Sequence, residues 1–281
     1  MDFDGFIGDI KANEWNVYGV QVHKAGRLAE SWGDTSEKHN IYSATKTVLS
    51  IAVGIAQDKA DLNKCVLDYL PSENIAKMSK ESFDAYKKIR LCDLLSMSVS
   101  AIPFQVEGEN WLDYALSFPA KAKGEFNYSN NSAYLVGVAL AGAIGGDVGT
   151  YIEENIFKPL EITDFSYVRS PEGFFYGASK MELSVESLSK IALVLYNGGE
   201  YESKRIVSSE YVKRATAIQQ MNREGGYGYF IWKYRDGFSI NGKWGQKCYI
   251  LPKDELMITY LSHVDDNAGV RESMEKHIID R

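Results

Sequence analysis

Apolar and polar side chains alternate along residues 16–34, which read NVYGVQVHKAGRLAESWGD. A period of two residues is typical of a β-strand that packs one face against a core. Lys24-Ala25-Gly26 interrupts the alternation and has the composition of a tight turn. The pattern therefore predicts a β-hairpin close to the N-terminus.

The pattern changes at residue 43, and from there to about residue 220 apolar positions recur mainly at helical spacing. The clearest predicted helices are 44–57, 132–144 and 185–197. The second runs into Gly145-Gly146 and the third into Gly198-Gly199, and glycine is the residue that most often ends a helix. Strand patterns return between residues 226 and 262, in the segments YGYFIWKY, KCYIL and LMITYLS, and a helical pattern follows at about 267–280.

This order of elements predicts an α/β fold of the α+β type, with residues 1–281 in one domain. Strands from both ends of the chain would form one antiparallel sheet flanked by helices, with an all-α region inserted between them. The expected α/β lobe comprises approximately residues 1–60 and 205–281, and the expected all-α lobe approximately residues 61–204. A cleft between the lobes is where we expect a functional site.

Composition narrows the class of ligand. The chain of 281 residues has a formal charge of -7, and its Lys and Arg residues are scattered, so no basic patch indicates nucleic acid or anionic lipid. No apolar run reaches the roughly 18 residues that span a bilayer, and the start MDFDGFIGDI lacks the basic residues of an export signal. We expect a cytoplasmic protein that binds a small molecule or short peptide; the sequence predicts no oligomeric state.

Metal and thiol chemistry have little support in the sequence. The three cysteines, Cys65, Cys92 and Cys248, are far apart and form no CxxC pair, which predicts reduced and mostly buried thiols. The four histidines show no metal-binding spacing, so we expect no metal or cofactor. The G-x-S-x-G turn of α/β-hydrolases is also absent from the sequence.

Ser43-Ala44-Thr45-Lys46 is the first candidate for catalysis. A serine hydroxyl needs a positioned base to act as a nucleophile at neutral pH, and side chains three residues apart on a helix lie on the same face. The spacing alone proves little, because it also occurs at 187–190 and 273–276. The apolar stripe of the helix predicted over 185–197 leaves its serine and lysine toward solvent, and the third copy lies in a charged segment.

The residues after Lys46 distinguish the first copy from the other two. The run TVLSIAVGIAQ is apolar on nearly every side, which predicts a helix in the middle of the protein. A lysine at the start of a buried helix is costly unless its ammonium has partners or its pKa falls, and a lowered pKa makes the amine a base. A second interpretation stays open, in which Ser43 caps the helix and Lys46 extends to solvent.

Two further segments carry suitable chemistry. Tyr128-Ser129-Asn130 precedes a predicted helix; its tyrosine could exchange a proton with Ser43 and Lys46, and its asparagine could orient the lysine and a substrate carbonyl. Gly242-Lys243-Trp244-Gly245-Gln246 stands at the entrance to a predicted strand, where a backbone amide could stabilise an oxyanion. Ordinary loop and turn roles account for both segments as well.

These segments occur in the order and rough spacing of the serine β-lactamase and penicillin-binding-protein superfamily. IRLCDLLSMS at 89–98 resembles the "I-x-x-x-D-L-L-x-M-T-S-G" of its class C branch, and GEFNYSN at 124–130 is similar to "P-G-x-x-F-x-Y-S-N". IFKPLEITD at 156–164 resembles "I-F-x-P-L-G-M-x-D", and GQKCYILP at 245–252 is similar to the "G-Q-x-x-x-x-x-P" strand of esterase-like members. The resemblance covers roughly residues 15–265.

The resemblance implies that Ser43 attacks an ester or amide carbonyl and becomes acylated, with Lys46 and Tyr128 as the proton-transfer groups. It also implies that the backbone amides of Ser43 and Gln246 form the oxyanion hole. Lys243 would match the lysine of the family's "K-T-G". The expected substrate-binding residues are Asn130, Lys243, Trp244 and Gly245.

Several departures from the family pattern affect the expected activity. Ser98-Val99-Ser100 replaces "T-S-G", Lys123 replaces the proline before Gly124, and Trp244 replaces the threonine of "K-T-G". These changes favour a serine hydrolase of small esters, amides or D-amino-acid-containing peptides over a dedicated antibiotic-degrading enzyme. Two alternatives remain: a β-lactamase or D,D-peptidase acting on β-lactams or cell-wall peptides, and a penicillin-binding or sensing module without turnover.

Overall fold

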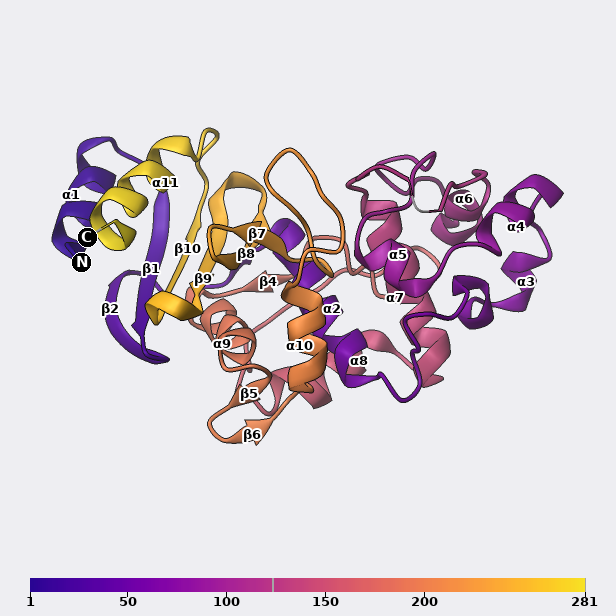
Figure 1. Cartoon of the computed structure of the whole chain (residues 1–281), viewed down its shortest axis with the longest axis horizontal. Helices are drawn as coiled ribbons and strands as arrows, with labels where there is room; N and C mark the ends of the chain where they lie inside the picture. The colour runs from indigo at the N-terminus through magenta and orange to yellow at the C-terminus, as the bar shows by residue number, and fades with distance from the viewer. Residues whose placement is uncertain (123, 281) are drawn as a thin grey trace.

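The computed structural model describes residues 1–122 and 124–280, so the departure at Lys123 lies outside the described residues. Six strands form one antiparallel sheet in the order β2-β1-β10-β9-β8-β7. Two strands come from the N-terminal hairpin and four from the C-terminal segment, so both ends of the chain share one sheet (Figure 1). The bounds are β1 (Val17–Lys24), β2 (Arg27–Gly33), β7 (Trp232–Tyr234), β8 (Gly237–Gly242), β9 (Gln246–Leu251) and β10 (Leu256–Ser262).

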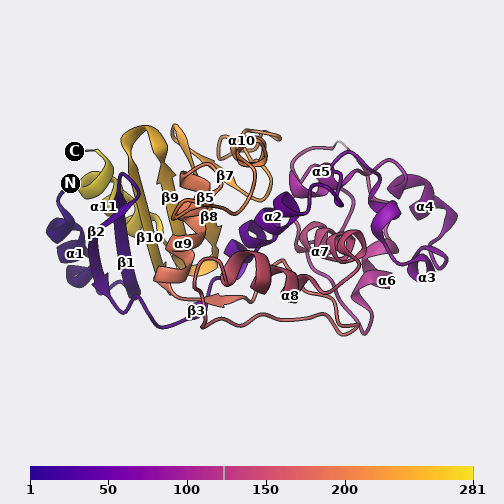
Figure 2. The ribbon, with the colours of Figure 1, turned by 90° about the horizontal axis from the view of Figure 1, so that it is seen from below.

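Helices cover both faces of this sheet (Figure 2). α1 (Phe3–Ala12) and α11 (Ala268–Met274) pack together on one face, and α9 (Val185–Tyr196) packs against β1, β9 and β10 on the other. Because both faces are covered, β10 is buried at every position, whereas the edge strand β2 is mostly exposed. The predicted antiparallel sheet flanked by helices is confirmed.

The middle of the chain forms a mainly helical region beside the sheet, along the long axis of the molecule (Figure 1). Its helices are α3 (Ser72–Ile75), α4 (Lys80–Tyr86), α5 (Leu91–Leu95), α6 (Trp111–Leu116), α7 (Asn130–Ile144) and α8 (Val148–Ile152). The remaining elements are β3 (His39–Asn40), β4 (Glu182–Leu183), β5 (Glu200–Tyr201), β6 (Lys204–Arg205) and α10 (Ser209–Thr216). Across the described residues no single helix could span a membrane by length and apolar content; α7 and the segment Val148–Phe157 pass that test only together, as a pair bent by 81°.

α2 (Thr45–Ile55) is the helix on which the two parts of the molecule meet. Every residue from Thr45 to Gly54 is buried, and the helix contacts α7 and α8 on one side and α10 on another. The apolar run that predicted a helix in the middle of the protein is therefore confirmed. A short 3-10 turn, Tyr42–Ala44, leads into α2 from the direction of the sheet.

Three features differ from the expectations. α1 has no counterpart among the predicted elements. α9 falls within the predicted all-α lobe of residues 61–204, yet its apolar stripe packs on the sheet. The strand expected from residue 226 starts only at Trp232, because Phe230 adopts a left-handed backbone conformation (φ 57°) and hydrogen bonds to α2 and α5 instead of to a strand.

Candidate active site

The turn that carries Ser43 is held in a strained conformation. Tyr42, the preceding residue, has φ 47°, a left-handed conformation that costs a residue with a side chain roughly 1–2 kcal/mol. The Asn40 Oδ1 accepts a hydrogen bond from the Tyr42 amide at 2.8 Å, and the Thr45 hydroxyl donates to the Tyr42 carbonyl at 2.6 Å. These two bonds fix the approach to α2 and present Ser43 at its N-terminal end.

Lys46 lies beside Ser43 and is only 1% exposed, so the interpretation in which it extends to solvent is wrong. Its Nζ is 3.2 Å from the Ser43 Oγ, and it donates to the Asn130 Oδ1 and to the Ala178 carbonyl, each at 2.6 Å. Burial lowers the pKa of Lys46 to about 7. A substantial fraction of this amine is therefore unprotonated at neutral pH, as a general base must be.

Asn130 is the first residue of α7, and its side-chain orientation is fixed by a second amide. The Asn130 Nδ2 donates to the Gln105 Oε1 at 3.0 Å, and the Tyr176 hydroxyl donates to the same oxygen at 3.1 Å. With its amino group engaged in this way, Asn130 must turn its Oδ1 toward Lys46. The sequence motif identified Asn130, but nothing in the sequence indicated Gln105 or Tyr176.

Tyr128 completes the group around Ser43. Its side chain makes a hydrogen bond with Ser43, and the Lys46 Nζ lies 5.0 Å from the centre of its ring. Burial raises the pKa of Tyr128 to about 12, although the bond to Ser43 opposes the rise. The phenol is therefore protonated at neutral pH and can serve as a proton donor.

The carbonyl of Ala178 is a site group that no sequence motif could reveal, because any residue type provides a backbone carbonyl. The pairing of β3 with β4 brings this segment next to the start of α2, and the Ile41 amide donates to the Met181 carbonyl. Gly177 has φ 67°, a conformation that favours glycine, and a side chain there would meet Leu49 of α2 at 2.7 Å. The close approach of this segment to α2 thus depends on Gly177.

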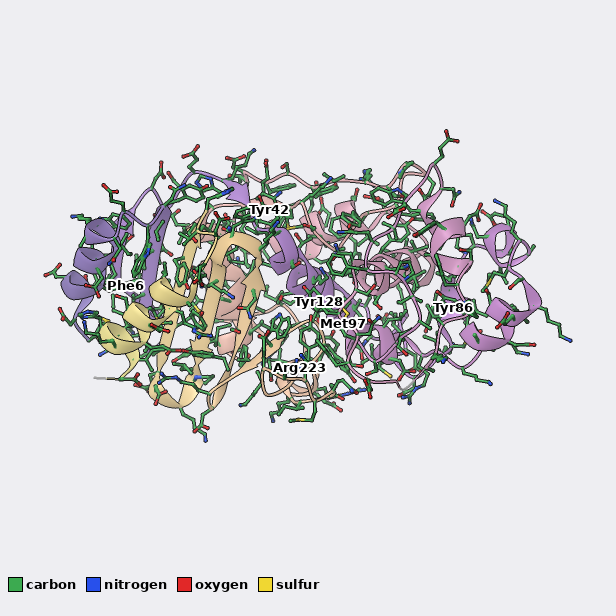
Figure 3. The ribbon with its side chains drawn as sticks, turned by 90° about the horizontal axis from the view of Figure 1, so that it is seen from above. Phe6, Tyr42, Tyr86, Met97, Tyr128 and Arg223 are labelled. Atoms are coloured by element: carbon green, nitrogen blue, oxygen red, sulfur yellow. The ribbon has the colours of Figure 1, made fainter. Side chains whose placement is uncertain are left out.

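These groups open into a cleft of about 440 Å³ at the junction of the sheet and the helical region. Figure 3 shows Tyr42 and Tyr128 near the middle of the molecule, between Phe6 at the sheet end and Tyr86 at the helical end. The cleft is lined by Tyr42, Ser43, Phe104, Gln105, Tyr128, Asn130, Ser179, Trp232, Asn241, Gly242 and Lys243. The structure therefore brings Ser43, Tyr128, Asn130 and Lys243 to one cavity, with Lys46 buried behind them.

Gly242, at the end of β8, explains how the sheet reaches the nucleophile. A side chain at Gly242 would meet the Ile41 carbonyl at 2.2 Å, so the absence of one lets β8 pack directly against the turn that carries Ser43. Lys243 begins a short 3-10 turn, and the first amides of such a turn have no partner within it. The Lys243 ammonium itself points to the Trp244 ring, 4.4 Å from its centre.

The other three residues of this segment depart from the expectation. Trp244, Gly245 and Gln246 are not among the described residues that line the cleft. Trp244 stacks on His263 with ring centres 4.2 Å apart, and the buried Gln246 side chain donates to the Lys243 and Ser262 carbonyls. These contacts stabilise the β8–β9 connection, and Trp232 is the tryptophan that lines the cleft.

The residues of the two other serine–lysine pairs take part in helix capping and in contacts between helices and neighbouring segments. Ser184 caps α9 by accepting a hydrogen bond from the Ser187 amide, and Lys190 donates to the Glu161 carbonyl. Ser273 and Lys276 both face Asp9 of α1. Within the described part of the chain, no group of three or more His, Cys, Asp and Glu residues is arranged to hold a metal ion.

Comparisons with known proteins found similar folds. A putative β-lactamase from Bacteroides dorei DSM 17855 superposes with a TM-score of 0.79 at 18% identity, covering 98% of this chain and 97% of that one. A D-stereospecific amidohydrolase from Streptomyces sp. gives 0.73 at 17% identity over 100% of both chains. A putative 6-aminohexanoate-dimer hydrolase from Bacillus anthracis gives 0.77 at 17% identity, over 96% and 80%.

At these identities the structural matches establish the shared fold alone. Comparison with curated protein sequences gave no match. The sequence model of one family, described as Beta-lactamase, matches residues 13–281, which is nearly the whole chain. The protein therefore belongs to the Beta-lactamase family of hydrolases.

Proposed function

We propose that the protein is a serine hydrolase that forms an acyl-enzyme on Ser43 and acts on small esters, amides or D-amino-acid-containing peptides. The observation that carries the proposal is the bonding of Lys46. A neutral amine has two N–H groups and one lone pair. The Asn130 and Ala178 oxygens, each at 2.6 Å, accept the two N–H groups, which leaves the lone pair for the Ser43 hydroxyl at 3.2 Å.

In this scheme the Ser43 proton passes to Lys46 as the Ser43 oxygen bonds to the substrate carbonyl carbon. The carbonyl oxygen becomes an oxyanion, for which we assign the backbone amides of Ser43 and Lys243 as donors. Both residues line the cleft, and both lie in short 3-10 turns at the point where β8 meets the nucleophile turn. Lys243 thus takes the role that the family resemblance implied for Gln246.

The leaving group departs with a proton from Tyr128, and protonated Lys46 then restores the Tyr128 proton. Water then enters the cleft and gives a proton to neutral Lys46 as its oxygen bonds to the acyl carbon. The bond between that carbon and the Ser43 oxygen breaks, and the Ser43 oxygen takes the proton back from Lys46, which releases the acid and restores the enzyme. The names of structurally similar proteins support an amide-type substrate, since one of them is a D-stereospecific amidohydrolase. Nothing else in the cleft is needed for these steps.

The test is the intact mass of the protein after mixing with p-nitrophenyl butyrate and, separately, with benzylpenicillin. We expect a butyryl adduct on Ser43 together with steady release of p-nitrophenol. Ser43→Ala should show neither signal, while Ser273→Ala should retain both. Rapid penicillin turnover would favour a β-lactamase, and a lasting penicilloyl adduct without turnover would favour a sensing module. Full hydrolysis by Ser43→Ala would refute the proposal.

A further inference from the structure

A second cavity adjoins the catalytic cleft. Its volume is about 660 Å³, and it lies between the segment at Glu125 and Phe126 and the loop that carries Arg223 and Glu224. Trp232 lines both this cavity and the catalytic cleft, so the two spaces share a wall. We call this second cavity the side groove.

Aromatic rings connect the side groove to the proton donor. The Phe126 ring centre is 5.9 Å from that of Trp232, and the Tyr128 ring centre is 5.5 Å from that of Trp232. Because the proposed mechanism delivers the leaving-group proton from Tyr128, the side groove lies on the leaving-group side of the scissile bond. In Figure 3, the label of Arg223 marks the loop at the side groove, and the label of Tyr128 marks the proton donor.

The charges around the side groove have no ion-pair partners among the residues that the structure describes. Glu125 and Glu224 contribute two carboxylates at its rim and Arg223 contributes one guanidinium, and all three are exposed. The groove therefore presents aromatic faces and more acceptor oxygens than cationic groups.

The charge of Glu224 acts on two other side chains, Tyr128 and Lys247. Burial raises the pKa of Tyr128, and the negative charge of Glu224 raises it further. Burial lowers the pKa of Lys247 to about 8, and the charge of Glu224 counteracts this lowering. Glu224 is therefore within electrostatic range of both side chains.

We propose that the side groove binds a positively charged alkylammonium group on the leaving-group side of the substrate. The cation would lie against the Trp232 and Phe126 rings, where the electron-rich faces of aromatic rings attract it, with Glu125 and Glu224 as counter-charges. Arg223 stands on the same loop and weakens this attraction. The assignment rests on the proposed function, because it depends on Ser43 and Tyr128 defining the reacting bond.

A pair of isosteric esters tests the proposal. Butyrylcholine and 3,3-dimethylbutyl butyrate have the same acyl group and the same leaving-group shape, but only the first is charged. We expect kcat/KM to favour the choline ester about fivefold, the size of effect that one exposed charge pair and one cation–π contact give. Glu224→Gln together with Glu125→Gln should lower the preference to about twofold, the part that the aromatic rings supply, whereas Arg223→Gln should increase it about twofold.

Glu81→Gln is the control for net charge, since this exposed glutamate belongs to α4 in the helical region, outside the side groove. Its preference should match that of the unmodified protein. The proposal would be overturned if kcat/KM for butyrylcholine did not exceed that for 3,3-dimethylbutyl butyrate. It would also be overturned if the ratio of the two values were unchanged in the variant that carries both glutamine substitutions. Hydrolysis of neither ester would instead count against the proposed function.

Calorimetric titration of the Ser43→Ala protein measures ligand binding to the side groove in the absence of turnover. We expect choline to bind more tightly than 3,3-dimethylbutanol, and the two glutamine substitutions to weaken choline binding about threefold. Equal affinity for choline and 3,3-dimethylbutanol would overturn the proposal, whatever kcat/KM values the two esters give.

Discussion

Ser43 and Lys46 have the same spacing as Ser273 and Lys276, yet the two lysines meet opposite surroundings. The Lys46 side chain is buried among acceptors, and burial lowers its pKa to about 7. The Lys276 side chain is 66% exposed and stands 3.9 Å from the Asp9 carboxylate. Ser273 donates to that same carboxylate at 2.8 Å, so its hydroxyl has an anion beside it rather than a base.

The comparison separates what helical spacing does from what burial does. A spacing of three residues places a serine and a lysine on one face of a helix, and both segments have this spacing. A lysine becomes a base only when desolvation disfavours its charged form, which depends on neighbours brought in from distant parts of the chain. Around Lys46 those neighbours are Asn130 and Ala178, 84 and 132 residues away.

The largest expected effect comes from exchanging each lysine for alanine. Lys46→Ala should lower kcat for p-nitrophenyl butyrate at least about 10²-fold, because Ser43 loses its proton acceptor. Lys276→Ala removes an exposed charge and should leave kcat within about twofold. Similar losses from the two substitutions would break the distinction between the pairs.

The next effect concerns the pH profile. Because the neutral amine is the active form, kcat/KM of the unmodified protein should rise with pH through about 7. Asn130→Asp places a carboxylate against the Lys46 ammonium, which favours the charged form and should move the midpoint upward by roughly 1–3 units. Rates at neutral pH should fall and recover in alkaline buffer; an unshifted midpoint would show that Lys46 is not the titrating base.

A smaller effect tests how firmly Asn130 is oriented. Tyr176→Phe removes one donor to Gln105 and should lower kcat a few-fold while costing about 1 kcal/mol of unfolding free energy. Tyr86→Phe is the matched control, since its buried hydroxyl donates to the Ala115 carbonyl far from the cleft. It should lose similar stability in urea denaturation with unchanged kcat. If both variants kept full activity, the Gln105 contact would have no role in positioning.

The smallest effect belongs to the serine of the C-terminal pair. Ser273→Ala removes a hydrogen bond between α11 and α1 and should lower the unfolding free energy by roughly 0.5–1.5 kcal/mol without changing kcat. Asp9 would keep its contacts with His277. Chemical denaturation measures the loss, and a change in kcat would show that this pair also influences the reaction.

Pattern alone predicted the hairpin, α2, α7, α9, β9 and β10 because each has a periodic run. It did not predict β8 (Gly237–Gly242) as a strand. α1 was missed because Gly5 and Gly8 lower the helix propensity of a short segment. Its helix is stabilised by packing instead: Phe6, Ile7 and Ile10 are buried against the sheet and α11. α9 was recognised as a helix, but its sequence did not show that the sheet was its partner.

The candidate site also contains residues that the sequence identified and residues that it did not. Ser43, Lys46, Tyr128 and Asn130 belong to short motifs and could be named from the sequence. Gln105 and Trp232 are ordinary residues in segments without a motif, and only folding brings them to the cleft. The segment at 242–246 was recognised, but which of its amides faces Ser43 depends on where the chain turns after β8.

Residue order by itself established the family resemblance, the helix behind Ser43 and the existence of a serine–lysine pair, because these are local properties of the chain. Burial lowered the pKa of Lys46, and the fold placed Lys243, but not Gln246, among the described residues that line the cleft. Desolvation and close approach arise between segments distant in sequence, so no local pattern contains them.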